Sequence, residues 1–235
     1  GPGSPVHVFV HGGYWRRFSA RDFAWVAEPL VATGVTAVIV NYALCPTVSL
    51  TEIVRQTRAA IAWCHLEIGR FGGDPARLTL SGHSAGGHLA LWLAARHRLP
   101  APSPLFTRDP QPIAGVVALA GIPDLVGAAR QAICGDAVIR LLGGEPETHP
   151  DRYAQASPAA LAPLGVPHVH IVGDRDHVIP LAYAEESVAA AAGAGDQAEL
   201  LLLANCGHFE VVHPFSAIWP LVMRAILTTA GLTVK

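Results

Sequence analysis

The sequence predicts an α/β fold, a mostly parallel and doubly wound sheet of about six strands with helices on both faces. Short apolar runs alternate with helical patterns along the whole chain. Most of these runs are almost continuously apolar, as in strands covered on both faces, and strand–helix alternation favours parallel pairing through right-handed crossovers. The chain has 235 residues and no internal repeat, so we expect a single domain over residues 1–235.

Six apolar runs are predicted strands, and five segments between or after them carry helical patterns. The predicted strands are Val6–Val10, Thr36–Tyr42, Leu78–Ser81, Ile113–Ala120, His168–Gly173 and Glu199–Ala204. The predicted helices are approximately Arg21–Thr33, Ser49–Arg70, Ala85–His97, Leu181–Ala192 and Pro214–Thr229. The segment 123–163 has few strand signals and is predicted to be irregular, forming a small lid.

The stretch Gly82-His83-Ser84-Ala85-Gly86 fits the pattern G-x-S-x-G and joins the third predicted strand to a predicted helix. A serine on such a sharp turn holds its hydroxyl exposed above a helix N-terminus. The two glycines let the strand and helix backbones pass too closely for a Cβ atom. A chance match among 23 glycines is the competing interpretation, and the strand–turn–helix context disfavours it. Ser84 is therefore the predicted nucleophile.

A Gly-Gly pair follows the first predicted strand, in His11-Gly12-Gly13-Tyr14-Trp15. The amide groups of such a pair can turn toward a bound atom and, with the N–H after the nucleophile, form an oxyanion hole. We expect Gly12, Gly13 and Ala85 to be the donors; the alternative is that the pair only turns the chain. His11 is expected to shape this loop through hydrogen bonds rather than to act as a base.

A serine hydroxyl needs a nearby base, and the base needs a carboxylate that orients it. After Ser84, the last two predicted strands each end in suitable residues at the carboxyl edge of the sheet. We predict His208 as the base and Asp176 as the orienting carboxylate. Asp174 is the rival carboxylate, which could instead cap the turn, and His213 is the backup base, more naturally placed at a helix start.

Aromatic residues flank the predicted catalytic positions and suggest an aryl substrate. Tyr14 and Trp15 follow the Gly-Gly turn and Phe209 follows His208, so all three are predicted to bind substrate. Ordinary packing is the alternative for Trp15 and Phe209. His168 and His170 share one face of a strand, but no third ligand is evident, so neither a metal nor any other cofactor is expected.

The composition restricts the classes of partner. The net charge of −2 gives no reason to expect nucleic acid or an anionic membrane. No apolar stretch is long enough to span a bilayer, and no signal peptide is visible. Four scattered cysteines predict free thiols in a reducing compartment, hence a cytoplasmic location. Lys235 is the only lysine, which we interpret as the codon bias of a GC-rich, bacterial genome.

These motifs resemble the α/β-hydrolase superfamily, within it the hormone-sensitive-lipase-like esterases and, more narrowly, the kynurenine formamidase (arylformamidase) group. The narrower resemblance rests on the His-Gly-Gly-Tyr-Trp turn, on the run 82–89 and on Gly-Gly-Asp-Pro at 72–75. It implies a serine hydrolase that cleaves small carboxylic esters with Ser84, Asp176 and His208 as its triad. The alternatives are hydrolysis of aryl formamides such as N-formylkynurenine and a non-catalytic ligand-binding role.

The chain departs from that pattern at its start. Such proteins usually carry two more edge strands before the His-Gly-Gly strand, and here they are missing. One sheet edge is then expected to be uncovered, and a homodimer would bury it. The opening Gly1-Pro2-Gly3-Ser4, without a methionine, is typical of a tag remnant or of an internal start in a longer protein.

Overall fold

The computed structural model describes residues 3–232, so Gly1, Pro2 and Lys235 lie outside the described residues. It contains one six-stranded sheet in the order β2-β1-β3-β4-β5-β6, and every pair of neighbouring strands is parallel. The strands are β1 (Ser4–Val10), β2 (Thr36–Val40), β3 (Gly73–His83), β4 (Val116–Leu119), β5 (His168–Gly173) and β6 (Ala198–Leu203). The predicted sheet is confirmed, with each strand at its expected place in the chain.

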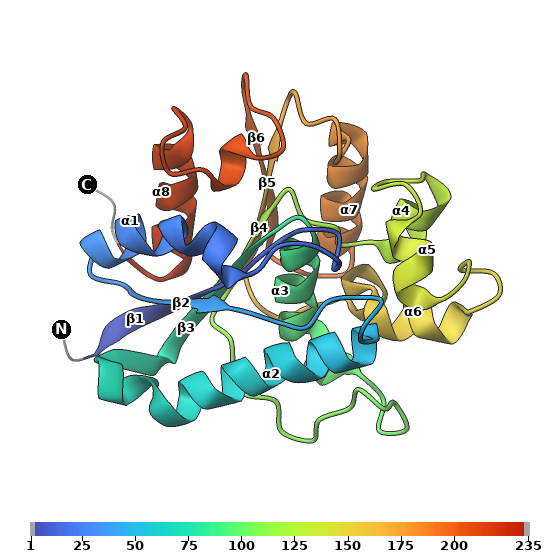
Figure 1. The fold of residues 1–235 in the computed structure, drawn as a ribbon, viewed down its shortest axis with the longest axis horizontal. Helices are drawn as coiled ribbons and strands as arrows, with labels where there is room; N and C mark the ends of the chain where they lie inside the picture. Colours follow the sequence, from blue (N-terminus) through green and yellow to red (C-terminus); the bar gives the residue numbers. More distant parts are fainter. Residues whose placement is uncertain (1–2, 233–235) are drawn as a thin grey trace.

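Helices cover both faces of this sheet. Figure 1 shows α1 and α8 on one side of the strands and α2 on the other, and α3 packs between α2 and the strands β1, β3 and β4. The sheet is therefore doubly wound. The α-helices are α1 (Ala27–Ala32), α2 (Leu50–Glu67), α3 (Ala85–Ala95), α4 (Leu125–Arg130), α5 (Ala137–Leu142), α6 (Pro150–Ala156), α7 (Leu181–Gly193) and α8 (Trp219–Thr229).

The strand order reverses at β1, because β2 lies on one side of it and β3 on the other. In open α/β sheets, ligands bind at the carboxyl ends of the strands at such a switch point. The register pairs Val10 at the end of β1 with Gly82 near the end of β3. The loops that follow these two strands therefore leave the sheet side by side, and they are the loops that carry Gly12 and Ser84.

Helix α3 is buried along its whole length. All of its residues are buried, and its sequence is apolar around the full circumference apart from one histidine. A helix without a polar face belongs inside a protein, where it is enclosed by the sheet and by other helices. This burial fixes the N-terminus of α3 at the carboxyl edge of the sheet, directly after Ser84.

The segment 123–163 is helical, not irregular, and the prediction for it was wrong in this respect. It contains α4, α5 and α6, which Figure 1 shows gathered at one end of the molecule. Each has only six or seven residues, which is too short to give a clear periodic signal or to be stable alone. The predicted helix 21–33 likewise divides into a 3₁₀ turn, Ala20–Val26, and α1.

Several histidines are buried in the sheet and in α3 and stay neutral. The ring of His7 on β1 forms hydrogen bonds with the hydroxyls of Thr79 (2.9 Å) and Ser81 (2.7 Å) on β3. Burial lowers the pKa of His7, His83 and His170 to about 3 and that of His88 to about 4. Neutral rings of this kind add hydrogen bonds to the core without adding charge.

Because the pKa values of these four histidines are lowered, we expect the protein to lose stability steeply in mild acid. An unfolded histidine titrates near pH 6.5, so below that pH the unfolded chain binds more protons than the folded chain. Each ring then lowers the free energy of unfolding by roughly 1.4 kcal/mol for every pH unit below 6.5, and the four together lower it by about 5 kcal/mol per unit. The whole free energy of unfolding of a typical protein is only about 5–15 kcal/mol. We expect similar urea midpoints at pH 7 and 8 and unfolding by about pH 4.5. A native near-ultraviolet circular dichroism spectrum at pH 4 would contradict this.

Candidate active site

Ser84 lies at a sharp elbow between β3 and α3. Its backbone has φ 52° and ψ −117°, a conformation that side-chain-bearing residues rarely adopt, and its N–H donates to the Leu119 carbonyl at 2.8 Å. Such strain persists only where the surrounding structure enforces it, and it is most common at functional sites. Ser84 is 3% exposed, and its hydroxyl forms no hydrogen bond with any other described residue.

Two glycines make the elbow possible. A Cβ atom added to Gly82 would lie 2.1 Å from the Gly86 carbonyl oxygen, and one added to Gly86 would lie 2.1 Å from the carbonyl oxygen of Val10. Real Cβ atoms do not approach backbone oxygens so closely. The expected reason for the glycines in G-x-S-x-G is therefore confirmed, and it extends to a third backbone, that of β1.

The Gly-Gly turn after β1 lies against Ser84. A Cβ atom added to Gly12 would be 3.3 Å from the Ser84 Cβ and 2.7 Å from the His83 carbonyl oxygen. Gly13 has φ +114°, and its carbonyl accepts the N–H groups of Arg16 and Arg17, each at 2.9 Å. The backbone N–H groups of Gly12 and Gly13 donate no hydrogen bond to a backbone carbonyl in the turns and loops of residues 3–232. The turn therefore presents unpaired amide donors beside Ser84.

His11 stabilises this turn through a hydrogen bond and through ring stacking. Its Nδ1 donates to the Gly12 carbonyl at 2.8 Å, and its ring stacks on Tyr42 with a centroid distance of 4.1 Å and an interplanar angle of 4°. The Tyr42 hydroxyl donates to the His11 carbonyl at 2.9 Å. The predicted loop-shaping role of His11 is confirmed by these contacts.

Trp15 has no exposed surface, which corrects the prediction that it contacts substrate. Its indole Nε1 donates to Nδ1 of His88 at 3.2 Å, and Nε2 of His88 donates to the Ala156 carbonyl at 2.9 Å. The indole is thus buried in the core and connects the residue after Tyr14, through His88 of α3, to the end of α6. Packing, the alternative considered for Trp15, is what the structure shows.

His208 and Asp176 form a buried hydrogen-bonded pair. The His208 Nδ1 donates to Oδ2 of Asp176 at 2.8 Å, and the two side chains are 9% and 0% exposed. The other carboxylate oxygen, Oδ1, accepts the N–H groups of Val178 (2.7 Å) and Ile179 (2.9 Å). Burial alone would raise the pKa of Asp176, but the bonds from His208, Ile179 and Val178 outweigh it and lower that pKa. A charged carboxylate therefore orients the imidazole.

Asp174 and His213, the alternatives to Asp176 and His208, are not part of this hydrogen-bonded pair. Asp174 is exposed and accepts the N–H of Cys206 at 3.2 Å, so it caps the turn, as the alternative for it held. His213 is also exposed; it follows the 3₁₀ turn Glu210–Val212 and accepts the N–H of Phe215 at 3.3 Å. It is not at the start of α8, so the prediction of a helix-start residue was wrong.

His83, which is not among the predicted site residues, connects the elbow to the His208 loop. Its buried Nε2 donates to the His208 carbonyl at 2.8 Å, and the two rings are 4.7 Å apart. Burial lowers the pKa of His83 to about 3, so its ring stays neutral. Because His83 directly precedes Ser84, this bond brings the His208 loop to the Ser84 elbow. The only signal in the sequence was its place as the first of the two variable residues of G-x-S-x-G.

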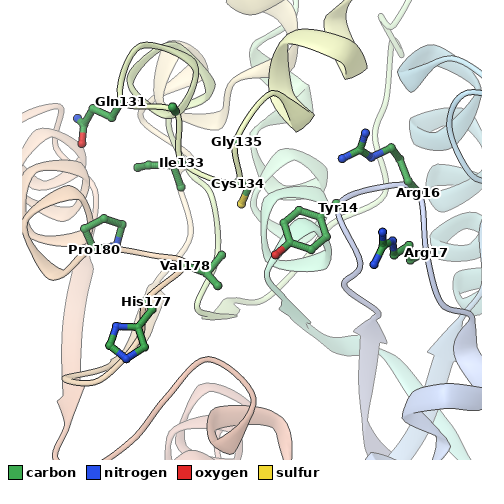
Figure 2. A pocket seen from close by; sticks show the side chains of 11 residues that line it. Tyr14, Arg16, Arg17, Gln131, Ile133, Cys134, Gly135, His177, Val178 and Pro180 are labelled. Carbon is green, nitrogen blue, oxygen red and sulfur yellow. The ribbon is translucent and has the colours of Figure 1, made fainter.

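The remaining predicted substrate contacts differ in position. Phe209 is 52% exposed and packs its ring against His83 and His208, at centroid distances of 5.2 and 5.4 Å. Tyr14 is half-buried and lines a cavity of about 600 Å³. Figure 2 shows this cavity, with Tyr14, Arg16 and Arg17 on one side and with His177, Val178 and Pro180 on the other.

The cavity adjoins the candidate catalytic residues without being lined by Ser84 or His208. Tyr14 directly follows Gly13, and His177 and Val178 directly follow Asp176. The residues 131–135, between α4 and α5, form a further wall. The predicted lid segment therefore contributes to the cavity beside the elbow.

The first 190 residues match the family model BD-FAE. The chain belongs to the BD-FAE family. Esterase LipQ of Mycobacterium tuberculosis is 27% identical over 196 residues, which cover 82% of this chain and 47% of LipQ. Kynurenine formamidase of Salmo salar is 33% identical over 122 residues, which cover 52% of this chain and 38% of that enzyme. The chain thus spans less than half the length of these two relatives.

The fold is that of solved α/β-hydrolase esterases, as the resemblance implied. The propionate-bound structure of the esterase Est2 from Thermogutta terrifontis superimposes with a TM-score of 0.79 at 21% identity, covering 100% of this chain and 86% of Est2. Within the described part of the chain no helix is long and apolar enough to cross a membrane. Residues 3–232 also contain no group of three or more side chains placed to hold a metal ion.

The close approach at the elbow predicts a sharp difference between two glycine-to-alanine substitutions. Gly86→Ala places a methyl group on the Val10 carbonyl, so it should lower the free energy of unfolding by more than about 3 kcal/mol or prevent folding. Gly193→Ala, at the last residue of α7, meets no atom within 4 Å and should leave stability equal or higher by up to about 1 kcal/mol. Urea titrations of the two variants measure the difference; equal stabilities would contradict the assigned role of Gly86.

Proposed function

We propose that this protein is a serine hydrolase of small carboxylic esters. Ser84 is the nucleophile, His208 the general base, Asp176 the carboxylate that orients it, and Gly12, Gly13 and Ala85 the oxyanion donors. The observation that carries the proposal is the His208–Asp176 bond of 2.8 Å, on a loop that His83 ties to the strained Ser84 elbow.

The arrangement performs acyl transfer in two similar halves. His208 takes the Ser84 proton while Ser84 Oγ attacks the ester carbonyl carbon, and negative charge moves to the carbonyl oxygen. The free amides of the Gly-Gly turn and of Ala85 receive that charge. The alcohol leaves with the proton from His208, and a water molecule then repeats the sequence on the acyl-enzyme.

Three features support these assignments. Asp176 accepts the Nδ1 proton of His208, which leaves the Nε2 lone pair available to a hydroxyl. Ala85 is the first residue of α3, so its N–H has no acceptor inside the helix. The serine–histidine bond itself commonly tightens only when substrate binds, which is consistent with a Ser84 hydroxyl that has no hydrogen-bond partner among residues 3–232.

Aryl formamides are the second candidate substrates. The similarity to kynurenine formamidase and the His-Gly-Gly-Tyr-Trp turn favour them, and the same acyl-enzyme route would release an aryl amine. Esters take precedence because LipQ matches a larger part of this chain than that formamidase does. A non-catalytic role is disfavoured because the serine, the base and the carboxylate are all present.

Replacing the nucleophile tests the proposal directly. Ser84→Ala should reduce kcat on 4-nitrophenyl acetate by at least about 10⁴-fold, because the remaining groups cannot form an acyl-enzyme. The circular dichroism spectrum should be unchanged, since the substitution removes one oxygen atom that makes no hydrogen bond within residues 3–232. Assays on N-formylkynurenine with the same pair of proteins distinguish the two substrate classes. Near-normal ester turnover by Ser84→Ala would overturn the mechanism.

The two neighbouring aspartates give a matched pair of variants. Asp176→Asn should lower kcat by about 10³–10⁴-fold, since an amide no longer fixes the productive tautomer of His208. Asp174→Asn removes the same charge from an exposed turn, two residues before Asp176 in the sequence. It should change kcat less than about threefold. Steady-state kinetics on 4-nitrophenyl acetate measure both; equal losses in the two variants would reject Asp176 as the orienting residue.

A further inference from the structure

Two arginines occupy one side of the cavity beside the elbow. Arg16 and Arg17 both donate their backbone N–H to the Gly13 carbonyl at 2.9 Å, so the turn that forms the proposed oxyanion hole also positions them. Figure 2 shows both side chains on the same side of the cavity, next to Tyr14. Arg16 is half-buried and Arg17 is exposed.

Among residues 3–232, the carboxylate next to the cavity, that of Asp176, is already bonded to His208 and to the backbone N–H groups of Val178 and Ile179. The residues that line the cavity in the described part of the chain include no aspartate or glutamate. Within residues 3–232 neither guanidinium takes part in an ion pair, whereas Arg55, Arg70, Arg130 and Arg140 each pair with a carboxylate. In a chain of net charge −2, this cavity is a local excess of positive charge.

A partly buried guanidinium without an anion is unfavourable, because it gives up hydration and receives no charged partner in return. Arginine offers a planar fork of N–H donors that matches a carboxylate in a bidentate manner. The opposite side of the cavity carries apolar surface from Ile133, Val178 and Pro180 next to the polar side chains of Gln131 and His177. The cavity therefore combines a pair of anion-binding groups with a surface suited to an aliphatic or aryl body.

We propose that the substrate of this enzyme carries a carboxylate, which Arg16 and Arg17 bind while the ester carbonyl lies between Ser84 and the Gly-Gly turn. This inference rests on the proposed function and narrows its substrate class. The carboxylate belongs either to the acyl group or to the leaving alcohol, and the same two arginines would bind it in both cases.

Matched ester pairs test this proposal in two arms. In the leaving-group arm, 4-acetoxybenzoate is compared with its methyl ester; in the acyl arm, the mono-4-nitrophenyl ester of glutaric acid is compared with 4-nitrophenyl pentanoate. The readout is the ratio of kcat/KM for the charged member to that for the neutral member. In the arm whose charged ester carries the carboxylate on the correct part of the molecule, Arg16→Gln and Arg17→Gln should each lower this ratio at least about tenfold relative to the unmodified protein.

Two further variants separate recognition from a general effect of charge. Arg16→Lys keeps the charge but loses the planar fork, so the ratio should lie between those of the unmodified protein and Arg16→Gln. Arg98→Gln removes the same charge from an exposed position on another part of the surface and should leave the ratio unchanged. Sodium chloride at 1 M should lower the ratio of the unmodified protein, because salt screens exposed charges.

A direct binding measurement keeps the outcome separate from turnover. Benzoate should bind the Ser84→Ala protein in calorimetry, and adding Arg16→Gln and Arg17→Gln should weaken that binding at least about tenfold. The inference is overturned if the ratios in both arms are the same in Arg16→Gln and Arg17→Gln as in the unmodified protein, or if adding both substitutions to Ser84→Ala leaves benzoate binding unchanged. Serine-dependent hydrolysis of the neutral esters would still stand in that case, whereas ester hydrolysis that survives Ser84→Ala would reject the proposed function instead.

Discussion

The close approach of three backbones at the Ser84 elbow is the constraint on which the rest of the site depends. At Gly82 and Gly86 the end of β3, the start of α3 and the end of β1 are separated by less space than a methyl group requires. This contact forces Ser84 into its strained conformation and presses the Gly-Gly turn against it. The cost of the strain, of order 1–3 kcal/mol, is offset by a helix that is buried along its whole length and cannot move away from the sheet.

The same elbow also fixes the C-terminal part of the site. His83 is the last residue of β3, and its bond to the His208 carbonyl holds the loop after β6 against the centre of the sheet, across β4 and β5. Asp176 arrives from the loop after β5, between them in the sheet. Three strands thus deliver three segments of distant sequence to one edge, and a neutral histidine makes the connection without placing a second charge beside the His208–Asp176 pair.

Parallel pairing explains why so much could be predicted from the sequence. Buried strands give continuous apolar runs, and residues that follow such runs must meet at the carboxyl edge, so Asp176 and His208 could be paired without coordinates. The partners of His83, Trp15 and His88 could not, because nothing in the spacing of residues shows which carbonyl or ring lies opposite a buried side chain. The helices α4, α5 and α6 were missed since their stability comes from packing at the end of the molecule rather than from a periodic sequence.

The residues after the Gly-Gly turn fall into two groups: one packs into the core and holds the turn in place, and the other lines the cavity. Tyr14 and Trp15 both have φ 58°, and these two successive left-handed residues direct one aromatic ring to the cavity and the next one into the core. Trp15 then connects the turn to His88 and to the end of α6, while Tyr14, Arg16 and Arg17 line the cavity. Because the two sets of side chains face different surroundings, the cavity residues can change without disturbing the amide groups beside Ser84. A scaffold built in this way can keep the proposed acyl-transfer chemistry while its substrate preference is set by a few residues of a single turn.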